Sequence, residues 1–263
     1  MFAMKCSWTW VSISIAVVVL VGVLSLHPAQ PGPPARKAVV VELFTSEGCS
    51  DCPPADELLA RLRQPASAEG VEVITLGLHV DYWNHQGWTD RFSSSAYSER
   101  QLHYVQKLRL PDAYTPQMIV DGTAQFVGNN PRLADQAIRE AARRQQHAEV
   151  QVNASDNQLQ VTAHGSQEAS SEVLLAVTED NLSSRVTAGE NNRRELRHAA
   201  VVRELRSLGK LRNGSFAASV PLNLKKEWKR DDLRVVVFVQ ETQNGPIDGA
   251  ASLQLSAQPA AGK

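Results

Sequence analysis

The pattern of apolar and polar residues divides the chain into three regions, and the first is a long apolar segment at the N-terminus. Residues 7–26 carry no charge and are mainly apolar, with Lys5 before them and no further charge until Arg36. About 20 apolar residues can span a bilayer as a helix, whereas the apolar core of a cleavable signal peptide usually has about 7–15. We therefore expect residues 1–37 to be a signal peptide or membrane anchor followed by a proline-rich linker. If Lys5 stays on the cytoplasmic side, both a signal peptide and a membrane anchor place the rest of the chain across the membrane.

The second region, residues 38–147, alternates strand-like apolar runs with helical patterns. The pattern predicts a strand at 38–44, a helix from Cys52, a second strand at 71–80 and a second helix at about 93–109. A hairpin at 117–128 and a helix from Pro131 follow. Strand–helix–strand crossovers imply a parallel pair of strands covered by helices. We therefore expect an α/β domain over residues 38–147.

The third region, residues 148–263, contains short alternating or apolar runs and no strong helical pattern. Six or seven such runs are typical of a β-sandwich of about 110 residues. The sequence thus predicts two folded domains behind the N-terminal segment.

Charge and motifs narrow the classes of function. Lys and Arg total 27 against 28 for Asp and Glu, so the net charge of −1 offers no general attraction to nucleic acid. The basic stretch 185–212 has no interleaved aromatic residues, which argues against a single-stranded nucleic acid partner. Phosphate-binding loops, dinucleotide fingerprints, H-E-x-x-H and G-x-S-x-G are absent from the sequence. We therefore expect no cofactor and no nucleic acid partner.

The three cysteines divide into one plus two. Cys6 precedes the apolar segment, while Cys49 and Cys52 form a C-x-x-C motif between a predicted strand and a predicted helix. The N–H groups and dipole at a helix start stabilise a thiolate, and the spacing lets the second thiol resolve a mixed disulfide. In an oxidising compartment the pair can also close as a disulfide. Without a second C-x-x-C no four-cysteine zinc site exists, so we expect no metal, although two thiolates with histidines are enough to bind one.

These features resemble the thioredoxin fold superfamily, through the strand ending at Phe44, the C-x-x-C that opens a helix, and Thr115-Pro116 before a hairpin. The segments VELFTSEGCSDCPPAD, HVDYWN, YTPQMIVDG and LRHAAVVREL look more closely like a family of exported bacterial thioredoxin-like proteins of unknown function, over residues 38–255. The resemblance implies a thioredoxin-like α/β domain at 38–147. It also implies a cis Pro116 beside the disulfide, where its backbone would pair with a substrate strand.

The motif departs from that of thioredoxins, which typically have Trp before the first cysteine and Gly-Pro between the two. Here Gly48 precedes Cys49, and Ser50-Asp51 separates the cysteines. Glu47 and Asp51 also bracket Cys49, and nearby anions disfavour a thiolate. We therefore expect a disulfide that is not strongly oxidising.

Candidate supporting residues follow the second predicted strand. If this strand runs parallel to the first, His79 and Asp81 lie at the same sheet edge as Cys49 and can act in proton transfer during exchange. The next loop offers side chains that can stack on or cover a substrate: Tyr82, Trp83, His85 and Trp88. The alternative is structural, with His79 as a hydrogen-bonded strand end and the tryptophans as part of the core.

Two functions are consistent with these observations. In the first, the chain is a thiol–disulfide oxidoreductase of the cell envelope, in which Cys49 exchanges with a substrate, Cys52 resolves the mixed disulfide and Thr115, Pro116 and the aromatic loop hold the substrate. Its partners would be protein or small-molecule thiols and disulfides, with membrane attachment if the N-terminal helix is retained and release into the periplasm if it is cleaved. In the second, the chain is a binding module with a structural disulfide.

Overall fold

Eight strands from both halves of the chain form one mixed sheet. The computed structural model describes residues 37–63, 70–155, 157–166 and 170–255. The strands of the large sheet are β1 (Lys37–Thr45), β2 (Val71–His79), β3 (Gln117–Val120), β4 (Ala124–Val127), β7 (Ser171–Glu179), β10 (Val201–Lys210), β12 (Leu233–Glu241) and β13 (Ile247–Gln254). Two smaller sheets are built from β5 (Glu149–Ser155), β6 (Gln158–His164) and β11 (Ser215–Pro221), and from β8 (Leu182–Arg185) and β9 (Glu195–His198). The helices are α1 (Pro53–Leu62), α2 (Ser95–Lys107) and α3 (Pro131–Arg143), with a 3-10 turn η1 (Arg230–Asp232).

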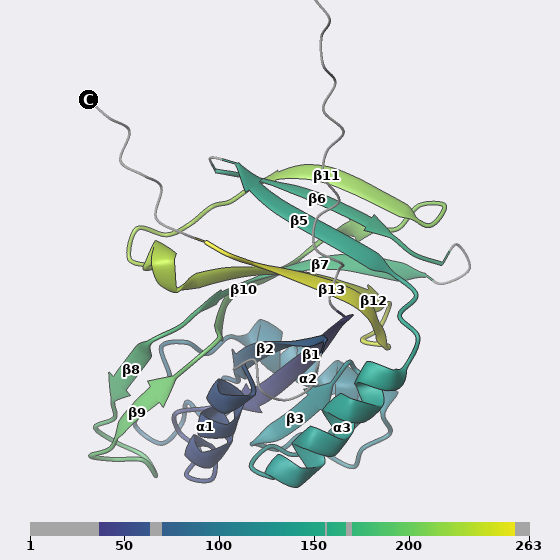
Figure 1. Cartoon of the computed structure of the whole chain (residues 1–263). Helices are drawn as coiled ribbons and strands as arrows, with labels where there is room; N and C mark the ends of the chain where they lie inside the picture. Colours follow the sequence, from purple (N-terminus) through teal and green to yellow (C-terminus); the bar gives the residue numbers. More distant parts are fainter. Residues whose placement is uncertain (1–36, 64–69, 156, 167–169, 256–263) are drawn as a thin grey trace, which may run out of the picture. The chain divides into compact units, whose positions relative to one another are not determined.

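The two halves of the large sheet meet where β10 pairs with β2. The strand order is β13-β12-β7-β10-β2-β1-β3-β4 (Figure 1). β1 and β2 are parallel, as the strand–helix–strand pattern predicted, and β10 joins β2 in parallel at Val201 and Gly77. The Gly77 N–H donates to the Ala200 carbonyl at 2.7 Å, and a Cβ at residue 77 would lie only 3.3 Å from that oxygen. Glycine therefore permits the close approach that continues the sheet.

Different layers cover the two faces of the large sheet. On one face, α2 contributes Tyr97 and Tyr104 to a core that also contains Phe44 of β1 and Phe238 of β12. On the other face, α1 and α3 pack on β1 and β3, while the sheet β11-β6-β5 packs on β7 and β12. Figure 1 shows the three-stranded sheet above β12 and β13, with α1 and α3 at the opposite end. One sheet thus carries a helical layer over one half and a sandwich layer over the other.

A buried ion pair strengthens the connection between the halves. Arg100 of α2 donates through Nε to Glu42 of β1 at 2.6 Å and through Nη2 to Gln240 of β12 at 2.9 Å. The Glu42 side chain is 0% exposed and that of Arg100 is 6% exposed. Because a buried charge that loses its partner is costly, this network holds α2 over strands from both halves of the sequence.

The predicted fold class is wrong, although the elements predicted for 38–147 are present. The chain is not an α/β thioredoxin-like domain followed by a separate β-sandwich. It is mostly β, with three α-helices among the described residues and one sheet that contains four strands from each half. An apolar run indicates that a strand is buried but not which strand it pairs with, so the pairing of β10 with β2 could not be foreseen.

The expected signal or anchor helix lies in residues 1–36, which are outside the described residues. Among the residues described, no helix is both long and apolar enough to cross a membrane.

Candidate functional site

The Cys49–Cys52 disulfide lies between the end of β1 and the start of α1. The two Cα atoms are 5.4 Å apart, and the residues are only 2% and 0% exposed. Cys52 is the N-cap of α1, and Pro53 and Pro54 occupy the first helical positions, where a missing N–H costs no hydrogen bond. The predicted helix start and the disulfide are both confirmed.

A proline turn lies close to the disulfide loop. The Thr115–Pro116 peptide is cis, the isomer that the resemblance implied. Trp83 connects the two segments, because its Nε1 donates to Thr115 Oγ1 at 2.8 Å and its Cβ packs against Gly48. A Cβ at residue 48 would lie 3.0 Å from the Trp83 Cβ. The glycine before Cys49 therefore makes room for a tryptophan that comes from the loop after β2.

Side chains of the loop between β8 and β9, residues 186–194, form hydrogen bonds with the backbone of the disulfide loop. The buried Asn191 side chain donates from Nδ2 to the carbonyl oxygens of Glu47 and Cys49, at 2.9 Å each. The Ser50 N–H donates to Glu190 Oε2 at 3.0 Å. Residues about 140 positions away in the sequence therefore fix the conformation of the C-x-x-C segment.

Five acidic and imidazole side chains, each less than one-tenth exposed, cluster behind this loop. His79 Nδ1 lies 2.7 Å from Asp90 Oδ2, and His198 Nε2 lies 3.1 Å from Glu47 Oε1. His198 Nδ1 lies 3.9 Å from Asp56 Oδ2, and the His79 and His198 rings are 5.0 Å apart. Asp56 belongs to α1 one turn after Cys52, so the cluster connects the helix, the end of β2 and β9.

The electrostatics of this cluster favour an ion pair between His79 and Asp90 and raise the pKa of Asp56. Burial lowers the pKa of His79, but the Asp90 carboxylate, with Asp56 and Glu47, outweighs burial and the net pKa is raised. Burial raises the pKa of Asp90, but His79 and two backbone N–H donors bring it below its usual value. Burial raises the pKa of Asp56 more than His198 and His79 lower it. Asp56 can therefore hold a proton at a higher pH than an exposed carboxyl group.

The remaining predicted residues occupy different positions around the site. Trp88 donates from Nε1 to Glu47 Oε2 at 2.9 Å, next to the disulfide loop. Asp81 accepts from the Ser98 hydroxyl of α2 at 2.5 Å. Tyr82 donates to Gln101 of α2 at 3.1 Å, and burial raises the pKa of its hydroxyl to about 12. The His85 ring stacks on Trp83 with 6.4 Å between centroids.

Four residues of the site were missed by the sequence analysis: Asp90, Glu190, Asn191 and His198. Asp90 lies within the aromatic loop and His198 lies within the LRHAAVVREL segment. Both segments were identified from the sequence, but neither residue was assigned a role. Glu190 and Asn191 had no signal, because their contacts are long-range and depend on the β8–β9 hairpin folding back toward α1.

Comparison with known families identifies the chain at the level of family. The sequence profile of a family described as "Protein of unknown function (DUF1223)" matches residues 40–240. The chain belongs to the DUF1223 family. The crystal structure of protein AGR_C_4864 from Agrobacterium tumefaciens is similar to this DUF1223 protein, with 25% identity and a TM-score of 0.68 over 87% of this chain and 100% of that one.

A second similar structure is HBP35 of Porphyromonas gingivalis, with 19% identity and a TM-score of 0.63 over 87% of this DUF1223 protein and 78% of that chain. At that identity the similarity concerns the fold alone. No curated protein matches the chain.

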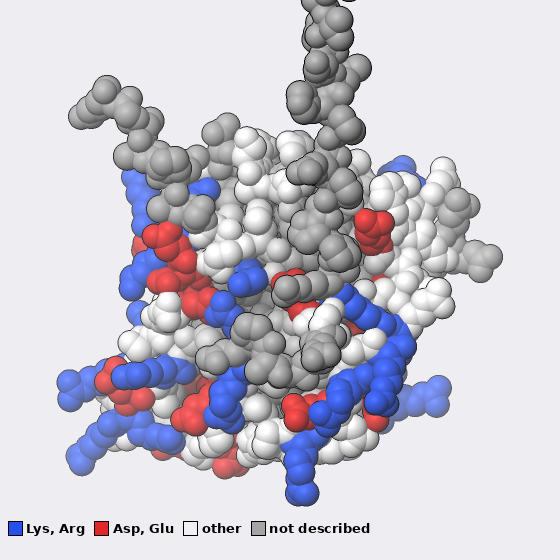
Figure 2. Space-filling view, viewed as in Figure 1, with Lys and Arg blue, Asp and Glu red and all other residues white. Residues whose placement is uncertain are grey.

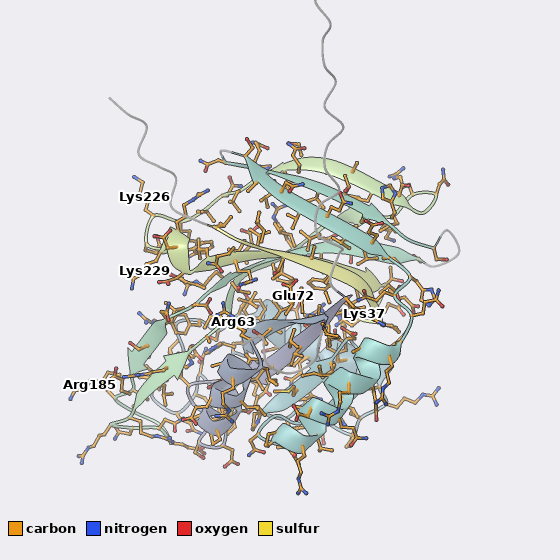
Figure 3. All side chains as sticks on the ribbon, viewed as in Figure 1. Lys37, Arg63, Glu72, Arg185, Lys226 and Lys229 are labelled. Atoms are coloured by element: carbon orange, nitrogen blue, oxygen red, sulfur yellow. A yellow bond between two sulfur atoms is a disulfide. The ribbon has the colours of Figure 1, made fainter. Side chains whose placement is uncertain are left out.

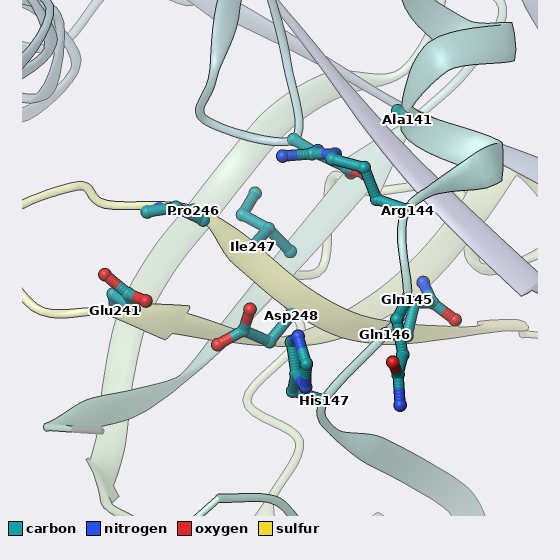
Figure 4. A pocket seen from close by; sticks show the side chains of 10 residues that line it. Ala141, Arg144, Gln145, Gln146, His147, Glu241, Pro246, Ile247 and Asp248 are labelled. Atoms are coloured by element: carbon teal, nitrogen blue, oxygen red, sulfur yellow. The ribbon is translucent and has the colours of Figure 1, made fainter. Parts of the chain in front are cut away.

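Two pockets of this DUF1223 protein contain acidic residues. One, of about 410 Å³, lies between α1 and the β8–β9 hairpin and includes Asp56 and His198 of the cluster. The other, of about 370 Å³, lies at the end of α3 beside β13, where His147 lies next to Asp248 and where Arg144 and Glu241 also line the pocket (Figure 4). Within the described ranges, no group of three or more His, Cys, Asp or Glu residues is arranged to hold a metal ion.

Proposed function

We propose that this chain is a thiol–disulfide oxidoreductase of the cell envelope and that Cys49–Cys52 is its redox pair. The observation that carries the proposal is a disulfide at the start of α1 that Trp83 links to the Thr115–Pro116 turn. The proposal extends the resemblance to the thioredoxin superfamily to this local arrangement and its chemistry, not to the fold of the whole chain.

Thiol–disulfide exchange at Cys49–Cys52 can run in either direction. A substrate thiolate attacks Cys49 Sγ, a new S–S bond forms, and the Cys49–Cys52 bond breaks to leave Cys52 as a thiolate that takes up a proton. In the reverse direction, Cys52 attacks the mixed disulfide and releases the substrate thiol. Asp56, one helical turn from Cys52 and with a raised pKa, is the nearest buried carboxyl group on α1 that can hold or release that proton.

The N-terminal sequence supports a location beyond the membrane. The uncharged segment 7–26 supports export, and beyond the membrane a disulfide can form and persist. The partners are then thiols and disulfides of the envelope, either proteins or small molecules, and membrane attachment depends on retention of the N-terminal segment.

A trapping experiment tests the proposal. With Cys52→Ala, Cys49 should accumulate mixed disulfides with envelope components, because the resolving thiol is gone. The Cys49→Ala variant is the matched control and should trap nothing. If neither variant forms a mixed disulfide and the wild-type pair stays oxidised in millimolar glutathione, the oxidoreductase proposal is wrong.

One observation favours a second function, that of a binding module with a structural disulfide. Both cysteines are almost fully buried, and Asn191 and Glu190 hold the loop around them. A disulfide that only closes the loop would be protected in this way, so the trapping experiment decides between the two functions.

A further inference from the structure

The pocket between α1 and the β8–β9 hairpin has polar groups without partners. Its volume is about 410 Å³, which lies in the range of small-molecule sites. The lining residues that carry the argument are Asp56, Glu57, Glu195, Arg197 and His198. The first two come from one side of α1, and the other three come from β9.

His198 supplies a buried nitrogen that lines the pocket and has no partner. Its side chain is 2% exposed, and its Nε2 lies 3.1 Å from Glu47 Oε1. Among the described residues its Nδ1 has no hydrogen-bond partner. Asp56 Oδ2, at 3.9 Å, is too far for a direct hydrogen bond but near enough for one donor group to contact both atoms. A buried polar atom in this state is a candidate contact for a ligand.

The charges of the pocket define the ligand further. Asp56 and Glu57 make its helical wall acidic, and Glu57 is already close to Arg61 of the same helix, at 4.0 Å. Glu195 and Arg197 lie on the exposed face of β9, and Arg197 makes no ion pair with any residue that the structure describes. A ligand that suits this pocket has a hydrogen-bond donor with positive charge at one end and an anion at the other.

We propose that this pocket binds the α-amino-acid group of a small molecule. The ammonium group donates to His198 Nδ1 and Asp56 Oδ2, and the carboxylate pairs with Arg197, whose planar guanidinium suits a carboxylate. This binding site goes beyond the exchange chemistry of Cys49–Cys52 and does not require it, although small amino-acid thiols carry the same group.

Binding of three probes to the oxidised full chain tests the site by calorimetry and by the ring nitrogen shifts of His198 in NMR. S-methyl-L-cysteine has both charged groups, 3-(methylthio)propionate lacks the amine, and 2-(methylthio)ethylamine lacks the carboxylate. We expect saturable binding of S-methyl-L-cysteine with a shift at His198. Loss of the amine should weaken binding about tenfold or more, because it removes charge-assisted hydrogen bonds to two buried groups.

Variants locate the two ends of the ligand. Arg197→Gln should remove the advantage of S-methyl-L-cysteine over 2-(methylthio)ethylamine, and Asp56→Asn should weaken both amines. Arg185→Gln is the matched control, because Arg185 lies on the same hairpin at its outer side and does not line the pocket (Figure 3). Figure 2 shows basic side chains projecting from this side of the molecule, so the control also tests general charge effects.

Three results would overturn the site. The first is the absence of saturable binding up to about 10 mM, a concentration well above the roughly 1 mM dissociation constant of a weak specific site. The second is equal binding of the probes with and without the amine. The third is unchanged selectivity between the probes in Arg197→Gln. If Asp56→Asn does not fold, the exposed Arg197 variant and the amine-free probe still decide. Because the disulfide stays closed throughout, the outcome is independent of the trapping experiment.

Discussion

Asp121, at the turn between β3 and β4, is a buried acid held by several parts of the fold. Its Oδ1 accepts from the Val40 N–H at 2.7 Å, and its Oδ2 accepts from Arg144 at 3.2 Å. Its carbonyl oxygen accepts from the Ile247 N–H at 3.0 Å. Burial raises the pKa of Asp121 to about 6, in spite of the hydrogen bond from Val40 and the charge of Arg144. A residue that joins β1, the end of α3 and β13 therefore titrates in a mildly acidic range.

This raised pKa predicts a contribution to stability that depends on pH. Between about pH 4 and 6 the folded state keeps the proton that the unfolded state releases, so the contribution is full below about 3.8 and is lost as the pH rises through 6. The shift corresponds to about 3 kcal/mol in the free energy of unfolding. Asp121→Asn, which cannot titrate, should lack this component when urea unfolding is compared at pH 4 and pH 7. Parallel pH profiles of the wild type and the variant would contradict the assignment.

At the residue scale, the sequence predicted the position of the disulfide better than the residues that surround it. The C-x-x-C spacing between a predicted strand and a predicted helix was sufficient to locate the disulfide at a helix start, because these signals are local. His79 was predicted at a strand end and lies in the buried cluster, but its partner Asp90 was not assigned. His198 and Asn191 could not be predicted, since their roles depend on contacts across more than 140 positions.

At the element scale, the β8–β9 hairpin links the basic part of the sequence to the disulfide loop. The basic stretch 185–212 contains the end of β8, all of β9 and all of β10. In this segment, Asn191 donates to the backbone carbonyl of Glu47, and His198 lies beside the Glu47 side chain. We therefore expect access to the disulfide to depend on how readily the hairpin loop opens.

Removing the Asn191 contacts should expose the disulfide. In Asn191→Ala, the carbonyl oxygens of Glu47 and Cys49 lose their donor, which costs about 1–3 kcal/mol and favours local opening. We expect reduction of Cys49–Cys52 by dithiothreitol, followed by thiol alkylation and mass spectrometry, to become roughly tenfold faster or more. Asn192→Ala, at the exposed neighbouring position, is the control and should react like the wild type. Equal rates in both variants would show that the hairpin loop does not limit access.

At the scale of the whole molecule, strand pairing is what the sequence pattern left undetermined. The apolar runs at 38–44 and 71–80 correspond to strands, and the helical patterns correspond to α1, α2 and α3. The pattern also indicated the change from a helix-rich to a strand-rich region near residue 147. It could not indicate that strands on both sides of that point share a sheet, because pairing through Gly77 and Val201 leaves no periodic signal.

Because strands from both sides of residue 147 share one sheet, we expect a destabilising substitution on one side to destabilise the other side as well. Phe238 of β12 is fully buried in the core beneath α2, together with Phe44 of β1. Phe238→Ala should lower the free energy of unfolding by about 3–5 kcal/mol. If the sheet is one cooperative unit, hydrogen exchange followed by mass spectrometry should show the loss of protection in β1 and β2 as well as in β12. Leu133→Ala, at an exposed position of α3, is the control and should change stability little. Unchanged protection of β1 and β2 in Phe238→Ala would instead mean that the regions before and after residue 147 fold independently, as the predicted domain boundary implies.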